Sequence, residues 1–413
     1  MHVLWIKTEL LHPVDKGGRI RTYHMLRALK QRHRVTYLTL DDGQAARDAV
    51  ERAAEYSDAL VRVPHRTAAK RTVRFYGELV ANLFSRLPYA VAKYRSPRLT
   101  DELRRLVRDE KVDVVICDFL APSLNVPDDL GVPAVLFQHN VEAMIWQRHA
   151  EVRKKSLAHA YFAEQWRRMV RFEREECRRF DRVIAVSVQD SEVIRREYGV
   201  ADAMDVPTGV DTDYFRPSGQ VAAEPLDMVF TGSMDWLPNE DGIRWFVDEV
   251  LPLIRAAEPG ATLTVVGRYP PAAIRDLAGR DASVRVTGTV PDVRPYVERA
   301  ALFVVPLRIG GGTRLKIFEA MAMERPVVST TIGAEGLPVA NGKDIVLADA
   351  ASDFAAAVVR LLRNPAERRA VGQQAAAKVR ADHAWDRVAD RFMELAAPAV
   401  APVEPGLSPA GRE

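Results

Sequence analysis

Cysteine and long apolar runs are scarce in this chain of 413 residues. The two cysteines, Cys117 and Cys177, are too few for a disulfide framework or a cysteine-based zinc site, so a reducing cytosol fits best. No stretch reaches the roughly 18 consecutive apolar residues of a membrane-spanning helix. Residues 2–6 lack the basic and apolar segments of a secretion signal, and we expect them to form a first strand.

Net charge is small, +3, but it is unevenly distributed. Residues 62–111 carry 13 Arg or Lys against 5 Asp or Glu, a local balance of +8. Aromatic residues such as Phe75, Tyr76 and Phe84 are interleaved with these cations. The pattern is typical of a surface that attracts anionic lipid or another polyanion, and equally of an Arg-rich helix pair that packs on its own aromatics.

Strand-like and helix-like segments alternate along the first half of the chain. Short apolar runs at residues 34–40, 112–117, 134–137 and 182–186 follow the first strand, with helical patterns between most of them. Strands that alternate with helices predict a parallel sheet covered on both faces.

The same alternation restarts after residue 225. Six further strand candidates occupy residues 227–232, 262–267, 283–288, 301–306, 326–329 and 344–347. We therefore expect an α/β protein with two Rossmann-like domains that face each other across a cleft, with ligands bound beyond the carboxyl ends of the strands. The expected parts are a first domain over 1–208, a linker over 209–225, a second domain over 226–380, a helix over 381–396 and a disordered tail over 397–413.

A glycine-rich turn is the strongest chemical signal. The strand before Pro306 leads into Gly310, Gly311, Gly312 and Thr313, and a helix then opens with Arg314, Leu315 and Lys316. Glycines let an anion approach the backbone, and the N–H groups of a helix start point at it, so this turn predicts a diphosphate site. Glu319 follows among apolar neighbours, where its carboxylate needs a partner such as a pair of ribose hydroxyls or a nearby Arg.

These motifs, together with residues 287–293, 326–337, the junction at 207–215 and the loop at 232–239, resemble the family 4 retaining glycosyltransferases of the GT-B fold. The resemblance implies that Glu319 holds the ribose of a nucleotide-sugar donor. It also assigns Gly17, Gly18, Gly232 and Ser233 to the donor, and places Gly288, Thr289 and Val290 beside the base.

Two departures from the family pattern are visible. Gly311 stands where the family has the first Glu of a Glu-x7-Glu pair, and Ser233 stands where it has an Arg, with no Lys near Asn239. Our hypothesis is that Arg314 and Lys316 supply the positive charge that the leaving diphosphate needs.

His139 comes directly after the strand segment at 134–138, where catalytic groups collect in α/β folds. The family has a His at the matching place near the reacting sugar, so the resemblance implies a catalytic role for His139. Asp118 and Arg19 are candidates for the acceptor side. No metal or other cofactor is expected, because the Asp-x-Asp at residues 211–213 lies in the junction and not at a strand end.

The resemblance thus implies a retaining transferase with a nucleotide-sugar donor and a sugar or lipid-linked acceptor. We expect it in the cytoplasm, in peripheral contact with an anionic inner membrane face and without a nucleic-acid partner. A nucleotide-sugar epimerase on the same architecture and a non-catalytic nucleotide-sugar-binding protein are the alternatives.

Overall fold

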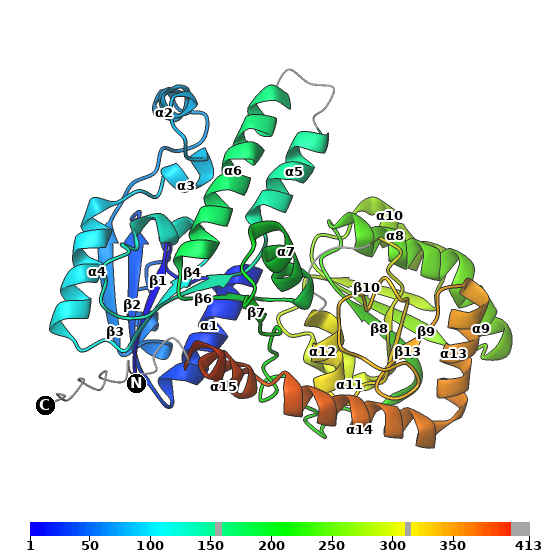
Figure 1. The fold of residues 1–413 in the computed structure, drawn as a ribbon. Coiled ribbons are helices and arrows are strands. Elements are labelled where there is room, and N and C mark those ends of the chain that lie inside the picture. Colours follow the sequence, from blue (N-terminus) through cyan, green and yellow to red (C-terminus); the bar gives the residue numbers. More distant parts are fainter. Residues whose placement is uncertain (153–158, 310–314, 398–413) are drawn as a thin grey trace, which may run out of the picture. The chain divides into compact units, whose positions relative to one another are not determined.

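The computed structural model describes residues 1–152, 159–309 and 315–397, which form two α/β units (Figure 1). Unit 1 comprises Met1–Pro207 and residues 388–397, and unit 2 comprises Thr208–Arg387. The predicted linker over 209–225 thus belongs to unit 2. The predicted tail, apart from Ala397, lies outside the described residues.

The described part of unit 1 is built on a parallel sheet of seven strands in the order β3-β2-β1-β4-β5-β6-β7. Its strands are β1 His2–Lys7, β2 Arg34–Asp41, β3 Ala59–Pro64, β4 Val114–Asp118, β5 Ala134–Gln138, β6 Arg182–Ala185 and β7 Met204–Asp205. Its helices are α1 Gly17–Lys30, α2 Val73–Leu83, α3 Tyr89–Ala92, α4 Pro97–Asp109, α5 Glu142–Val152, α6 His159–Arg179 and α7 Val188–Tyr198.

Unit 2, as far as it is described, repeats the design with six parallel strands in the order β10-β9-β8-β11-β12-β13. These are β8 Glu224–Thr231, β9 Thr262–Val266, β10 Val284–Gly288, β11 Ala300–Val305, β12 Val327–Ser329 and β13 Val346–Leu347. The helices are α8 Leu237–Trp245, α9 Leu251–Ala257, α10 Ala272–Arg280, α11 Arg294–Arg299, α12 Leu315–Ala322, α13 Ala351–Arg363 and α14 Pro365–Asp382.

The prediction of a two-domain α/β protein with parallel sheets is confirmed. The two edge strands of the first sheet, β3 and β7, were not predicted from the sequence. An edge strand buries fewer side chains than a central one, so its apolar signal is weak. In β3 only Val63 is buried, whereas β1 and β4 are buried throughout.

The last helix, α15 Trp385–Ala396, adds apolar side chains to unit 1 from Val388 onward. Phe392 is fully buried, with its ring 4.9 Å from that of Phe137 and 5.7 Å from that of Trp5. No helix in the described ranges is both long enough and apolar enough to cross a membrane.

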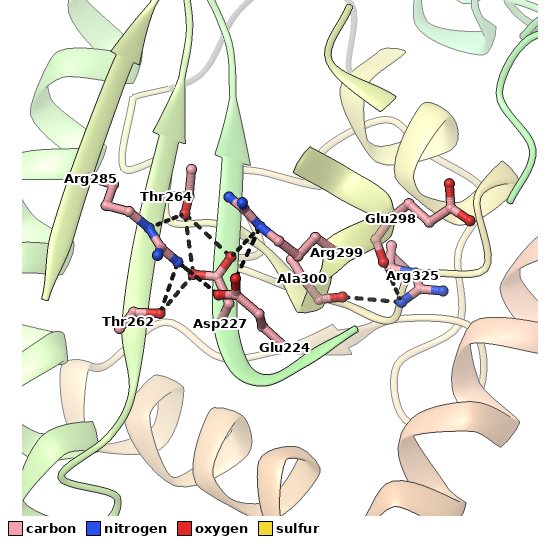
Figure 2. A network of polar contacts seen from close by, with 9 residues as sticks. All are labelled: Glu224, Asp227, Thr262, Thr264, Arg285, Glu298, Arg299, Ala300 and Arg325. Atoms are coloured by element: carbon pink, nitrogen blue, oxygen red, sulfur yellow. Dashed lines mark hydrogen bonds and ion pairs between the residues drawn. The ribbon is translucent and has the colours of Figure 1, made fainter. Parts of the chain in front are cut away.

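A charged network lies near the amino ends of the unit 2 strands (Figure 2). Asp227 is buried and accepts hydrogen bonds from Thr262 at 2.8 Å and from Arg285 at 3.0 Å. Since ligands of such sheets bind at the carboxyl ends, we assign this network to stability.

Candidate functional site

The carboxyl ends of three adjacent strands bring a cation, a carboxylate and an imidazole together in unit 1. Lys7 ends β1, Asp118 ends β4, and His139 follows Gln138 at the end of β5. These strands are direct neighbours in the sheet, in the order β1-β4-β5. Parallel strands present their ends at one edge, which is why residues more than 100 positions apart in sequence meet here.

Asp118 is the centre of this cluster. It is fully buried, and its Oδ2 accepts hydrogen bonds from Lys7 Nζ at 2.8 Å, Thr22 Oγ1 at 2.6 Å and Trp5 Nε1 at 3.0 Å. Its Oδ1 lies 2.6 Å from His139 Nε2, at an angle away from an ideal hydrogen bond. The sequence predicts that Asp118 contacts the acceptor. In the structure its side chain is buried instead and contacts Lys7 and His139.

Burial controls the charges of these groups. Desolvation lowers the pKa of His139 to about 4, although the Asp118 carboxylate acts in the opposite direction. Burial alone would raise the pKa of Asp118, but the charge of Lys7 and the contacts of the carboxylate with Lys7 and His139 outweigh it and hold that pKa below its usual value. At neutral pH the cluster therefore contains an ionised Asp118 and a neutral His139, which can exchange hydrogen bonds with a sugar without carrying charge.

Phe119 covers the imidazole from one side. Its ring stacks on that of His139 with centroids 3.9 Å apart and planes at 17°, and Lys7 Nζ lies 4.0 Å from the same ring. A Cβ on Gly18 would approach Phe119 Cζ to 2.6 Å, whereas one on Gly17 would meet nothing within 4 Å. Gly18 is thus required for packing, and Gly17 leaves open space at the start of α1.

Arg19 lies beside a polar cavity of about 220 Å³ in unit 1. Its guanidinium donates to Glu9 Oε2 at 2.6 and 3.0 Å, and Asp41 and His12 also line the cavity. Arg19, which the sequence predicts on the acceptor side, therefore lines a cavity in unit 1.

Glu173 on α6 is a residue that the sequence did not single out. Its carboxylate accepts from the backbone N–H groups of Glu142 at 2.8 Å and Ala143 at 2.9 Å, and from Tyr198 Oη at 2.7 Å. Burial raises its pKa to about 7. Glu173 fixes the start of α5, which lies three residues after His139. Its place on the buried face of α6 is the sequence feature that could have identified it.

Glycines bring the first loops of unit 2 into close contact. A Cβ on Gly267, after β9, would lie 1.7 Å from the carbonyl oxygen of Gly232, after β8. A Cβ on Gly232 would lie 2.7 Å from Lys316 Nζ and 2.8 Å from Asn239 Nδ2. A Cβ at Gly267 would therefore clash with the backbone, whereas one at Gly232 would require the ends of the Lys316 and Asn239 side chains to shift.

Lys316 reaches this loop from α12. Its Nζ donates to Asn239 Oδ1 at 2.9 Å and lies 4.1 Å from the Phe230 ring centroid. Asn239 in turn donates to the Ser233 carbonyl at 2.7 Å. The sequence offered no Lys near Asn239; the fold supplies one.

Arg268 is a second cation at the same loop and was not predicted. Its Nε donates to Ser233 Oγ at 3.1 Å, and Ser233 Oγ donates to Asp235. Its position directly after Gly267, at the end of β9, was a signal that could have found it.

Glu319 lies one turn after Lys316 on α12 and is partly exposed. Desolvation raises the pKa of Glu319 to about 7, although the charge of Lys316 acts to lower it. Its carboxylate has no hydrogen-bond partner within the described ranges, so a paired Arg is not seen there. Of the other predicted donor residues, Gly288 ends β10 with φ 71°, followed by exposed Thr289 and half-buried Val290.

The rest of the predicted phosphate turn, namely Gly310, Gly311, Gly312, Thr313 and Arg314, lies outside the described residues. The described chain resumes at Leu315, the first residue of α12.

Two family models match this chain. Residues 16–214 match the one described as Glycosyltransferase Family 4, and residues 225–364 match the one described as Glycosyl transferases group 1. Solved structures with a similar fold include sucrose-phosphate synthase from Thermosynechococcus elongatus, with a TM-score of 0.62, 18% identity, and 96% of this chain and 98% of that chain covered. Anabaena HepE in complex with UDP has a TM-score of 0.64 at 12% identity, with 96% and 100% covered.

Curated relatives match over shorter stretches. D-inositol 3-phosphate glycosyltransferase of Mycobacterium avium is 31% identical over 211 residues, 46% of this chain and 47% of that protein. Phosphatidyl-myo-inositol mannosyltransferase of Mycobacterium leprae is 30% identical over 204 residues, 47% and 53% of the two chains. The chain thus spans about half the length of these relatives. The two family models account for most of both units, and the chain belongs to the group 1, family 4 glycosyltransferases.

Proposed function

We propose that this chain transfers a sugar from a nucleotide-sugar donor to an acceptor with retention of the anomeric configuration. The observation that carries this proposal is the Lys316 ammonium held beside Gly232 and Asn239 at the carboxyl edge of the unit 2 sheet. As the bond between the sugar and the diphosphate breaks, negative charge concentrates on the departing phosphate, and a fixed cation stabilises it.

Unit 2 is the donor half in this proposal. Gly288, Thr289 and Val290 line the base, and Glu319 accepts hydrogen bonds from the ribose. The segment from Gly310 to Lys316 holds the phosphates. Support for a nucleoside diphosphate leaving group comes from the structural relative HepE, whose solved complex contains UDP.

Unit 1 contributes His139 and the acceptor side. A neutral His139 donates or accepts a hydrogen bond at the reacting sugar, and the buried Lys7–Asp118 pair holds its ring in place. Gly17 leaves room for the donor at the start of α1, and Arg19 contacts the acceptor from the neighbouring cavity. The proton of the acceptor hydroxyl passes to the departing phosphate, so no metal or enzyme nucleophile enters the proposal.

The acceptor is proposed to be a sugar or a lipid-linked sugar. One curated relative is named for phosphatidyl-myo-inositol, a lipid, which supports the lipid-linked class. We place the enzyme in the cytoplasm at the inner face of a membrane, because residues 62–111 carry a balance of +8 that attracts anionic headgroups.

A nucleotide-sugar panel tests the proposal. A donor at a hundred times its Kd stabilises the folded protein by about 2.7 kcal/mol, so the true donor raises the melting temperature. The stabilising donor is then incubated with candidate acceptors, and NMR of the product reports the anomeric configuration. Inversion contradicts retention, and an isomerised sugar formed from donor alone identifies an epimerase. Donor binding with no turnover across the acceptors favours a binding protein.

A further inference from the structure

One helix of unit 1 turns an apolar face to solvent. Five side chains on α2 and directly after it are exposed: Val73 (91%), Tyr76 (56%), Val80 (58%), Leu83 (52%) and Phe84 (91%). At about 100° per residue, these positions fall within an arc of about 100° on one side of the helix. Soluble proteins seldom expose so many large apolar side chains in one stripe, which marks the face as an interaction surface.

The opposite side of α2 attaches the helix to unit 1. Phe75 packs edge-to-face on Tyr89 with centroids 5.8 Å apart. The buried Asn82 donates to the Leu87 carbonyl at 3.1 Å and accepts from Gln165 at 3.1 Å. The helix is therefore fixed by its inner side, and the exposed stripe is not a core face that a shift of the helix would bury.

Cations flank the apolar stripe in the sequence. Arg66, Lys70, Arg71 and Arg74 lie before or at the start of α2, and Arg86 lies just after it. The one acidic residue of this segment, Glu78, accepts from Arg74 Nε at 2.9 Å and Tyr89 Oη at 2.9 Å. An apolar helix face whose flanking segments are basic fits the boundary between the headgroups and acyl chains of an anionic bilayer.

We infer that α2 inserts its apolar face into an anionic membrane while the flanking Arg and Lys side chains bind lipid headgroups. This rests on the peripheral contact proposed above and adds insertion to electrostatic attraction. The flanking cations favour a lipid surface over a second copy of this chain, because two copies would bring the same cations together. Figure 1 shows α2 on the outside of unit 1, away from the strands of its sheet.

Vesicle sedimentation at two salt concentrations separates insertion from attraction. The vesicles are phosphatidylcholine alone or phosphatidylcholine mixed with phosphatidylserine, and the full chain is used. Salt screens the attraction of the cations but leaves apolar burial in place. We expect the unmodified chain to sediment with the anionic vesicles at low salt and to remain partly bound at high salt.

Variants assign the two components. Val80→Ser with Phe84→Ser should lose the salt-resistant binding, whereas Leu253→Ser, at an exposed apolar position in unit 2, should not. Arg66→Gln with Lys70→Gln should weaken low-salt binding by about 25-fold, at about five-fold for each cation. In Phe84→Trp, vesicles with brominated acyl chains should quench fluorescence beyond the loss seen in the unmodified chain.

Three results would overturn insertion. The unmodified chain could stay in the supernatant, or the Val80→Ser, Phe84→Ser variant could sediment like the unmodified chain at high salt. The unmodified chain could also be a dimer that this double variant dissociates. Donor-induced thermal shift in the same variants keeps the two proposals apart. If vesicle binding persists while every donor fails, the transferase proposal is wrong and insertion stands; the reverse result removes insertion alone.

Discussion

Lys316 Nζ lies 2.9 Å from Asn239 Oδ1, although the two residues are 77 positions apart in the chain. Asn239 belongs to α8, after the first loop of unit 2, and Lys316 to α12. This contact brings a cation to the loop in which Ser233 replaces the Arg expected from the family resemblance. The proposed donor site therefore recovers its positive charge from a different helix.

Lys316→Ala should lower turnover by roughly 10²- to 10³-fold, the cost typical of removing one group that stabilises a transition-state charge. Donor affinity should fall less than turnover, because the phosphate gains most of its charge as the bond breaks. Steady-state kinetics with the donor found in the panel measures both. Lys378→Ala is the matched control, since Lys378 pairs with Asp382 on the surface of α14. Equal turnover in both variants would contradict the role of Lys316.

Gly18→Ala should destabilise the protein by about 1–3 kcal/mol, because its Cβ would approach Phe119 Cζ to 2.6 Å and push that ring onto His139. Gly17→Ala, with nothing within 4 Å, should leave the stability unchanged or raise it slightly. Urea denaturation of the two variants gives the comparison. A loss of stability in Gly17→Ala equal to that in Gly18→Ala would show that the Phe119 contact is not the cause.

The stability of the protein should fall as the pH drops from 6.5 to about 4, with His139 as one contributor. The pKa of His139 is about 4 in the folded protein, against the ordinary histidine value of 6.5 that the unfolded chain restores. The unfolded chain therefore binds more protons in this window. The contribution is about 3 kcal/mol at neutral pH and is lost on acidification.

His139→Gln, which does not titrate, should flatten this part of the pH profile relative to the unmodified chain. Glu173, whose pKa is raised to about 7, acts in the opposite direction, since its contribution is lost as the pH rises. Subtracting the two urea-denaturation profiles isolates His139. If the difference in unfolding free energy between the unmodified chain and His139→Gln stays the same from pH 7 to pH 4, His139 is not buried in its neutral form.

Donor affinity should rise as the pH increases through about 7. The pKa of Glu319 is raised to about 7, and its ionised form is the better acceptor for ribose hydroxyls. In Glu319→Gln the affinity should be lower and independent of pH in this range. Asp227→Asn, in the network of Figure 2 at the other edge of the sheet, should reduce stability but not donor affinity. Titration calorimetry from pH 6 to pH 8 tests this, and a flat profile in the unmodified chain would exclude Glu319 as the ribose ligand.

The candidate site could be predicted only in part. Gly18 and His139 were identified because the first stands at a helix start and the second directly after a strand. Glu319 was identified because a carboxylate among apolar neighbours needs a partner. Their roles in donor binding and catalysis stay predictions. Arg268 and Glu173 were not predicted. Arg268 follows a strand and Glu173 lies on a buried helix face, but these positions do not reveal their partners Ser233 and Tyr198, which are far away in sequence.

Local periodicity in the sequence determined the alternation of strands and helices, and with it two parallel sheets whose carboxyl ends gather the polar residues. Only the tertiary structure decided which strands are neighbours, and thereby that Lys7, Asp118 and His139 form one buried cluster. It also decided that the apolar side chains of α2 face solvent, which the sequence did not predict. The reason is physical: backbone hydrogen bonding and apolar spacing act between near neighbours in the chain, whereas burial and charge pairing depend on segments that only folding brings together.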